Sequence, residues 1–297
     1  MTIIVWLVLS LIWGTTWIFI KTGLKDLPPL TFAAARFILA MAILYAVIRI
    51  QNIQFPRTKA EWKLILLTGI LQFSVNYSSV FWSEQYISSG LAAVLQATIT
   101  VFGLLLAWIF LPNERITKLK ISAVFLGITG VAIIFAEQLQ VNDFWAFAGC
   151  AAIVLGAYAA AQSSILVKAK GTSLHPAMLL FCQMLCGIPF IVIYALAVEG
   201  NPLKHNWSAN AVLSVLYLSV FGTVLAFWFY YWLLGKIEST KAMMISLVTP
   251  LLAVVIGAVF LNEKLPPQTF FGGVLILASI GLIVFRKKRK LQLQEQN

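Results

Sequence analysis

The sequence predicts an all-α integral membrane protein with ten transmembrane helices in two inverted five-helix repeats. The first observation behind this prediction is composition: apolar residues make up 61% of the 297 residues, charged residues make up 10%, and the mean hydropathy is +0.93. Such a chain has too little polar surface to cover a soluble globule. The second observation is that the two halves of the chain repeat each other at a shift of 150 residues.

Ten stretches are long enough to cross the bilayer as helices, because about 18 or more nearly uncharged residues suffice. In chain order we expect spans at residues 3–20, 30–48, 64–83, 87–111, 119–136, 144–167, 177–198, 210–234, 239–261 and 268–285. Short loops join these spans, so the sequence predicts no soluble domain.

The internal repeat consists of identical residues at equivalent positions of the two halves. At a shift of 150, Trp82, Ile87, Ser89, Ala92, Phe110 and Leu111 fall on Trp232, Ile237, Ser239, Ala242, Phe260 and Leu261. A shift of 149 places Asn113–Glu114 on Asn262–Glu263. Because five spans per half is an odd number, the second half enters the bilayer in the opposite orientation. We therefore expect a first repeat over residues 1–140, a second over 141–286, and a basic cytoplasmic tail over 287–297.

The distribution of Lys and Arg predicts the orientation in the membrane. With the N-terminus inside, 16 of these residues fall in cytoplasmic segments and 4 in outside loops. The positive-inside rule then places both termini in the cytoplasm. The charged residues behind the formal net charge of +11 lie between the spans and not on a folded surface. They therefore indicate orientation and contact with membrane lipid. We expect no nucleic acid partner. We expect a multi-pass protein of the cell inner (plasma) membrane, and the sequence leaves its oligomeric state open.

Several short segments resemble a known family. They are Ile12–Trp17 in the first span, Tyr86–Leu95, Phe110–Arg115 and Phe260–Lys264, together with Arg36 in the second span. This combination resembles the EamA-type families of the drug/metabolite transporter superfamily over almost the whole chain. The resemblance implies ten helices, cytoplasmic termini and a central substrate cavity between the halves. These families often carry a proline midway along both repeat-related helices, whereas this chain has Pro250 in span nine but Thr100 in span four, which argues against symmetric kinks.

The inverted repeat and the absence of a nucleotide-binding loop predict a secondary transporter that works by alternating access. With the resemblance, we expect an exporter of small organic metabolites or drugs, such as amino acids or related compounds. The alternative is an integral-membrane enzyme that acts on a lipid-linked substrate. Such an enzyme needs clustered acids, His or Cys, but His175 and His205 are single and have no acid cluster beside them. A channel is disfavoured because no charge ring or filter sequence is present.

We expect no catalytic residues, no cofactor and no metal site. The three cysteines, Cys150, Cys182 and Cys186, all fall inside predicted spans. No His or acid lies near them in the sequence to complete a set of metal ligands, so they are expected to be packing residues.

Candidate cavity residues are the polar and aromatic side chains predicted near the middle of the membrane. They are Trp13, Thr16 and Trp17 in span one, Arg36 in span two, Asn76 in span three, Gln96 and Thr100 in span four, Tyr158 and Gln162 in span six, Trp228 in span eight, and Ser246, Thr249 and Pro250 in span nine. Aromatic faces suit an aromatic, apolar or cationic solute. Amides and hydroxyls in hydrocarbon also bind neighbouring helices, so helix packing is the alternative interpretation. Pro250 leaves the carbonyl of Ser246 without its helical donor, and this oxygen needs water, a solute or a hydroxyl such as that of Thr249.

Two charged residues have several possible roles. Arg36 is the only strong charge well inside a span, so it should face protein or water and have a partner. A structural counter-charge, a group of carbonyls or a substrate carboxylate would each serve, and the presence of Arg here across a family with differing substrates favours a structural or gating role. Glu84, near the outer end of span three, is the candidate for proton coupling, with a solvated loop carboxylate as the alternative. The repeat-related loop acids Glu114 and Glu263 are expected to hold a turn or a neighbouring helix end.

Overall fold

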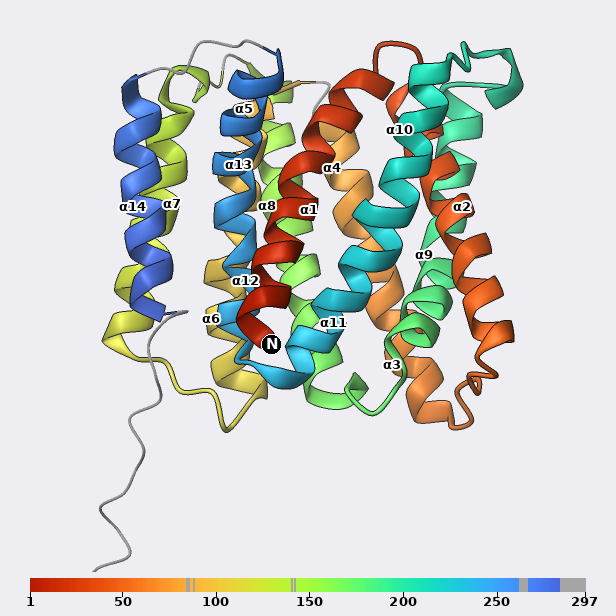
Figure 1. Cartoon of the computed structure of the whole chain (residues 1–297), viewed down its shortest axis with the longest axis horizontal. Helices are drawn as coiled ribbons and strands as arrows, with labels where there is room; N and C mark the ends of the chain where they lie inside the picture. The colour runs from red at the N-terminus through yellow and green to blue at the C-terminus, as the bar shows by residue number, and fades with distance from the viewer. Residues whose placement is uncertain (84–85, 88, 140, 142, 262–266, 284–297) are drawn as a thin grey trace, which may run out of the picture.

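The computed structural model describes residues 1–83, 86–87, 89–139, 141, 143–261 and 267–283, and every regular element among them is a helix. Within these residues, eight helices are long and apolar enough to cross a membrane, which confirms the all-α integral membrane class. Among the described residues, the helices expected as spans five and ten cover 17 residues each. The first helix begins and the last helix ends at the same end of the bundle (Figure 1).

The helices follow the predicted spans. In the first half they are α1 (Thr2–Gly23), α2 (Pro29–Ile50), the continuous α3 (Lys59–Gly69), η1 (Ile70–Asn76) and α4 (Tyr77–Ser83), then α5 (Ser89–Gln96), α6 (Ile99–Phe110), α7 (Lys118–Ile134) and η2 (Ala136–Gln138). In the second half they are α8 (Phe144–Leu166) with η3 (Val167–Gly171), α9 (Pro176–Val198), η4 (Pro202–Lys204), the continuous α10 (Ala209–Ser219), η5 (Val220–Leu225) and α11 (Ala226–Lys236), then α12 (Ser239–Met243), α13 (Ile245–Leu261) and α14 (Pro267–Ile283).

Local sequence signals fix several helix starts. Thr58 and Glu61 form a capping box at the start of α3, in which the backbone N–H of each residue donates to the side chain of the other. Pro29 and Pro176 are the first residues of α2 and α9, where the missing N–H has no intrahelical partner to lose.

Two π-helical stretches occupy equivalent places in the two halves. η1 begins at Ile70 and η5 begins at Val220, which is the 150-residue shift of the sequence repeat. A π-helical turn widens the helix locally and changes the direction in which later side chains point, and such turns are common at functional sites. The two π-helical stretches therefore have the same spacing in the chain as the repeated residues of the sequence.

The predicted fourth span is two helices, because the chain tightens between α5 and α6. The N–H groups of Thr98 and Thr100 donate to the carbonyls three residues before them, those of Leu95 and Ala97, at 3.1 and 3.2 Å. The two hydroxyls donate to the same carbonyls at 2.6 and 2.7 Å, so threonine side chains stabilise the interruption. The ninth span is also interrupted, at Met244 between α12 and α13. Both spans are therefore irregular, but the interruptions at residues 97–98 and at Met244 are not related by the 150-residue shift.

Helices from the two halves pack against each other in pairs. α7 packs against α14, α2 against α9, α1 against α13, and α6 against α8. Figure 1 shows α7 and α14 side by side at one edge of the bundle. Their backbones approach closely at Gly130 and Gly272, since a Cβ added at Gly130 would lie 2.6 Å from the carbonyl oxygen of Gly272. Small residues at such crossings allow dispersion contacts that large side chains would prevent.

Candidate functional site

A central cavity of about 270 Å³ lies between side chains from both halves of the chain. Its walls come from α1, α2, η1, α4, α5 and α6 in the first half, and from α8, α11, α12 and α13 in the second. This volume suits a small solute, near the lower limit of typical ligand sites. Seven residues predicted from the sequence line the cavity: Trp13, Thr16, Arg36, Asn76, Gln96, Ser246 and Thr249.

Arg36 is the only charged side chain among the described residues that line the cavity. It is 7% exposed, its Nε donates to Thr223 Oγ1 at 3.0 Å, and its guanidinium carbon lies 4.9 Å from the ring centroid of Phe37. In the described part of the chain, no carboxylate lies within ion-pair distance of it. A guanidinium buried within an apolar helix of a membrane protein needs a compensating partner, so the cavity favours a negatively charged group beside Arg36.

The cavity also contains hydrogen-bonding groups that are not satisfied. Gln96 Nε2 donates to Asn76 Oδ1 at 3.1 Å. Gln96 Oε1 and Ser246 Oγ are buried and have no hydrogen-bond partner among the described residues. Buried polar atoms nearly always have a partner, so these two oxygens are places where a donor group of a solute, such as an ammonium, gains a hydrogen bond.

Pro250 is buried within α13 and does not line the cavity. The carbonyl that its ring deprives of a donor, that of Ser246, accepts a long hydrogen bond of 3.4 Å from Thr249 Oγ1. The predicted hydroxyl partner is therefore present, at the outer limit of hydrogen-bond length. Because Ser246 and Thr249 both line the cavity, this stretch of α13 forms part of its wall.

One wall of the cavity is aromatic. The ring centroid of Trp13 lies 5.8 Å from that of Phe227 and 5.5 Å from that of Tyr230, which are normal distances for interacting rings. The Tyr230 hydroxyl donates a hydrogen bond to Ser164 Oγ at 3.0 Å. This wall offers an apolar surface next to the polar groups of Gln96 and Arg36.

Sequence reasoning did not include several lining residues among its candidates. They are Tyr77, Phe81, Ser164, Phe227, Tyr230 and Met243. A usable signal existed for two of them, because Phe227 and Tyr230 are three residues apart in an aromatic run and so share one helix face. The others required knowledge of how each helix is rotated about its axis.

Five predicted cavity residues lie elsewhere: Thr100, Tyr158, Gln162, Trp228 and Pro250. Tyr158 is 38% exposed and packs on the ring of Phe102, because α8 turns Ala160 and Ser164 toward the cavity instead. The Trp228 ring packs edge-on against His175, with centroids 5.3 Å apart. The Trp17 side chain and the coupling candidate Glu84 lie outside the described residues.

The chain is similar in sequence to a family of membrane transporters and in fold to a solved structure. The model of the EamA-like transporter family matches residues 1–136 and 147–285. The uncharacterized transporter YoaV of Bacillus subtilis (strain 168) is 24% identical over 282 residues, covering 95% of this chain and 96% of its own. A probable amino-acid metabolite efflux pump of Escherichia coli (strain K12) is 25% identical, covering 94% and 93%. A solved crystal structure has the same fold, with a TM-score of 0.80, 14% identity and 95% of each chain covered.

Proposed function

The chain belongs to the EamA-like transporter family, and from this membership we propose that it is a secondary transporter that exports amino acids or related small organic compounds by alternating access. Family membership points away from the enzyme alternative and implies a small-molecule substrate. The observation that carries the proposal is the central cavity between the two halves. Among the described residues that line it, Arg36 is the only charged side chain, and it lies with an aromatic wall and with two oxygens, Gln96 Oε1 and Ser246 Oγ, that have no described hydrogen-bond partner. The name of the Escherichia coli relative agrees with this substrate class.

The proposed architecture is ten transmembrane helices in two inverted repeats, over residues 1–140 and 141–286, with a basic tail over 287–297. Three observations support it: the family model matches twice, the π-helical stretches η1 and η5 are related by the same shift as the sequence repeat, and the packing is symmetric under exchange of the halves. In this exchange α1·α13 corresponds to α6·α8, while α2·α9 and α7·α14 each correspond to themselves. Such symmetry is the arrangement that allows each half to rock against the other.

The proposed location is the cell inner membrane, with both termini in the cytoplasm. The bias of 16 to 4 in Lys and Arg supports this orientation. Single cysteines introduced near Asp26, Glu137 and Lys204, in a chain without its natural cysteines, should react with an impermeant reagent added outside the cell. Reaction at these three loops only after lysis would reverse the proposed orientation.

The cavity can hold a zwitterion by matching its charges. A carboxylate beside Arg36 supplies the counter-charge that the described residues lack, and Arg is suited to a carboxylate because its planar donors can bind both oxygens. An ammonium can donate to Gln96 Oε1 and Ser246 Oγ, and an apolar side chain can pack on Trp13 and Phe227. Charges paired in this way leave no uncompensated ion in the low-dielectric interior.

The test is transport by the purified protein in proteoliposomes. We expect uptake of radiolabelled amino acids, with much weaker uptake of the amines that lack only the carboxylate. Arg36→Lys should weaken transport of carboxylate-bearing solutes selectively, whereas Arg49→Lys, an exposed position on the same helix, should not. If all solutes lose transport equally in Arg36→Lys, Arg36 is structural; if no amino acid or organic cation is transported by the natural protein, the proposed substrate class is wrong.

Energy coupling is proposed to involve Glu84 or to be absent. Among the described residues that line the cavity there is no Asp, Glu or His, and moving a proton across the bilayer usually requires a titratable group whose environment changes. We therefore propose either exchange with little dependence on the proton gradient, or a dependence that Glu84→Gln removes. Gradient-driven accumulation that is unchanged in Glu84→Gln would contradict both forms.

A further inference from the structure

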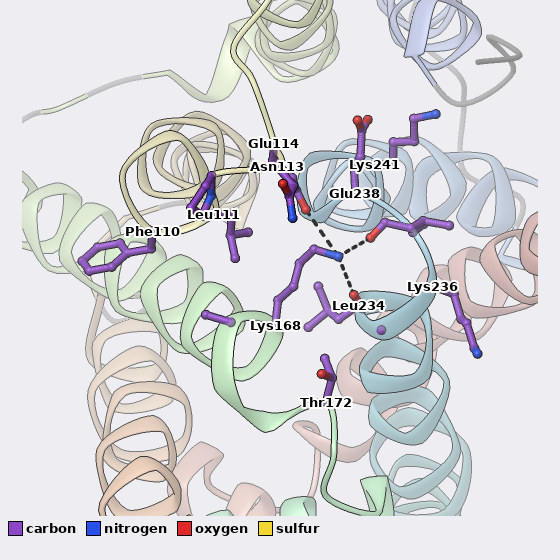
Figure 2. A pocket seen from close by; sticks show the side chains of 14 residues that line it. Phe110, Leu111, Asn113, Glu114, Lys168, Thr172, Leu234, Lys236, Glu238 and Lys241 are labelled. Carbon is purple, nitrogen blue, oxygen red and sulfur yellow. Dashed lines mark hydrogen bonds and ion pairs between the residues drawn. The ribbon is translucent and has the colours of Figure 1, made fainter. Parts of the chain in front are cut away.

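Three side chains from separate segments meet at the end of the bundle where α1 begins. Glu114 follows α6, Lys168 lies in η3, and Ser239 is the first residue of α12; these three residues are the Glu114 cluster. Both carboxylate oxygens of Glu114 accept the N–H of Ser239 at 2.9 Å, and one of them accepts its hydroxyl at 2.6 Å. Figure 2 shows the Lys168 ammonium pointing at Glu114, 3.3 Å from Oε1.

Lys168 extends the cluster to the end of α11. Its Nζ also donates to the carbonyl oxygens of Leu234, in the last turn of α11, at 2.6 Å and of Ile237, which follows α11, at 2.5 Å (Figure 2). The Glu114 side chain is 6% exposed, so this charge is almost removed from water and its hydrogen bonds come from protein donors. Charge-assisted bonds of this kind are among the stronger ones in proteins.

The cluster lies one helical turn from the central cavity on three helices. The cavity residue Ser164 precedes Lys168 by four residues, Tyr230 precedes Leu234 by four, and Met243 follows Ser239 by four. Residues four apart lie above one another on the same helix face. The cluster therefore joins the three helix ends that surround this end of the cavity.

The cluster also connects the two halves of the chain. Glu114 belongs to the first half, whereas Lys168 and Ser239 belong to the second. If the halves rock against each other during transport, bonds between them at one end must form in one state and break in the other. Glu114 thus lies at a point where the proposed movement is resisted by specific hydrogen bonds.

We propose that the Glu114 cluster is the gate that closes the cavity toward the cytoplasm, and that its bonds break when the cavity opens to that side. This inference rests on the proposed function for the alternating access of the cavity and for the side to which it opens. A hollow of about 570 Å³ beside the cluster is lined by Lys236, Glu238 and Lys241 as well as by Glu114 and Lys168. Water in such a polar hollow can replace the broken hydrogen bonds, so the gate is reversible.

The experiment measures access to the cavity from each side of the membrane. Ser246→Cys, in a chain without its natural cysteines, provides a single thiol in the cavity wall. Its reaction with an impermeant maleimide is compared in inside-out and right-side-out vesicles. We expect Glu114→Gln and Lys168→Met to increase labelling from the cytoplasmic side about tenfold or more, since each removes a charge-assisted hydrogen bond. Labelling from the outside should fall in the same variants.

Two matched controls separate the gate from a general effect of charge. Glu238→Gln removes a carboxylate from the same hollow, where its only ion pair among the described residues is a 3.8 Å contact with Lys120, and it should leave labelling unchanged. Glu263→Gln alters the repeat counterpart of Glu114, in a segment that the structure does not describe, and should not increase cytoplasmic labelling. Ser239→Ala removes a single donor and should give a smaller change in the same direction as Glu114→Gln.

Unchanged cytoplasmic labelling in both Glu114→Gln and Lys168→Met would overturn the gate, provided that each variant elutes as the parent does in size-exclusion chromatography. If either is lost from the membrane, Ser239→Ala decides, because an unchanged labelling rate in that milder variant also overturns the proposal. The labelling requires no knowledge of the solute. A failure to transport amino acids would therefore count against the proposed function while leaving the gate supported by its own result.

Discussion

The substitution Gly130→Ala should destabilise the protein by forcing α7 and α14 apart. The new Cβ would lie 2.6 Å from the carbonyl oxygen of Gly272, 2.8 Å from Ile276 Cγ1 and 3.1 Å from the Ile276 nitrogen. Comfortable contacts between carbon atoms are about 3.5–4.0 Å. Two of these three atoms belong to the backbone, so no change of rotamer relieves the overlap and the helices must separate by roughly 1 Å at their crossing.

The expected cost follows from a comparison with a glycine that has space around it. Overpacking a well-packed contact costs about 1–3 kcal/mol, while replacing Gly by Ala within a helix gains about 1 kcal/mol of helix propensity. Gly281 lies on α14, and nothing is within 4 Å of the Cβ position there. Gly281→Ala therefore has the propensity gain without the overlap, and the difference between the two variants isolates about 1–3 kcal/mol of overpacking.

The assay is thermal unfolding of the purified protein in detergent, followed by tryptophan fluorescence at one fixed scan rate. A change of 1 kcal/mol shifts Tm by about 2–4 °C in a chain of 150–250 residues, so Gly130→Ala should melt several degrees below Gly281→Ala. Equal melting temperatures for the two variants would refute the reasoning, because they would mean that the backbones of α7 and α14 are not in contact at Gly130.

Three further predictions concern single side chains. Thr223→Val should lower the free energy of unfolding by about 1.5–3 kcal/mol, the value of a hydrogen bond to a charged group, because Arg36 Nε loses its acceptor. Thermal unfolding of this variant beside the natural protein measures the loss, and an unchanged Tm would show that the bond is not formed. Ser246→Ala removes a buried hydroxyl that has no partner, so it should leave Tm unchanged or raised while weakening uptake of amino compounds; a loss of stability without a change in uptake would contradict this. Burial lowers the pKa of His175 from its usual 6.5, and its neutral Nδ1 accepts the N–H of Ala177 at 3.3 Å. The natural protein should therefore lose stability relative to His175→Asn as the pH falls through 6.5 toward the lowered pKa. Parallel Tm-versus-pH curves for the two proteins would exclude this role.

The sequence alone was sufficient for the class of protein and for the approximate positions of the long apolar helices among the described residues. In hydrocarbon each backbone N–H and C=O must bond within its own segment, so a long apolar stretch can only be a helix. This is why the spans predicted from hydropathy coincide with the helices to within a few residues. The expectation that Glu114 holds a neighbouring helix end is also confirmed, by its bonds to Ser239 at the start of α12.

Only the tertiary structure decided which face of each helix meets the cavity. Hydropathy cannot distinguish Tyr158, which is exposed, from Ser164 on the same helix, which lines the cavity, because most faces of a membrane helix are apolar. The rotation of each helix depends on irregularities such as η1, η5 and the turn at Thr98, which arise from local hydrogen bonds without a clear sequence signal. The partners of Arg36, Gln96 and Glu114 come from distant segments, and they exist only when the two halves are packed together.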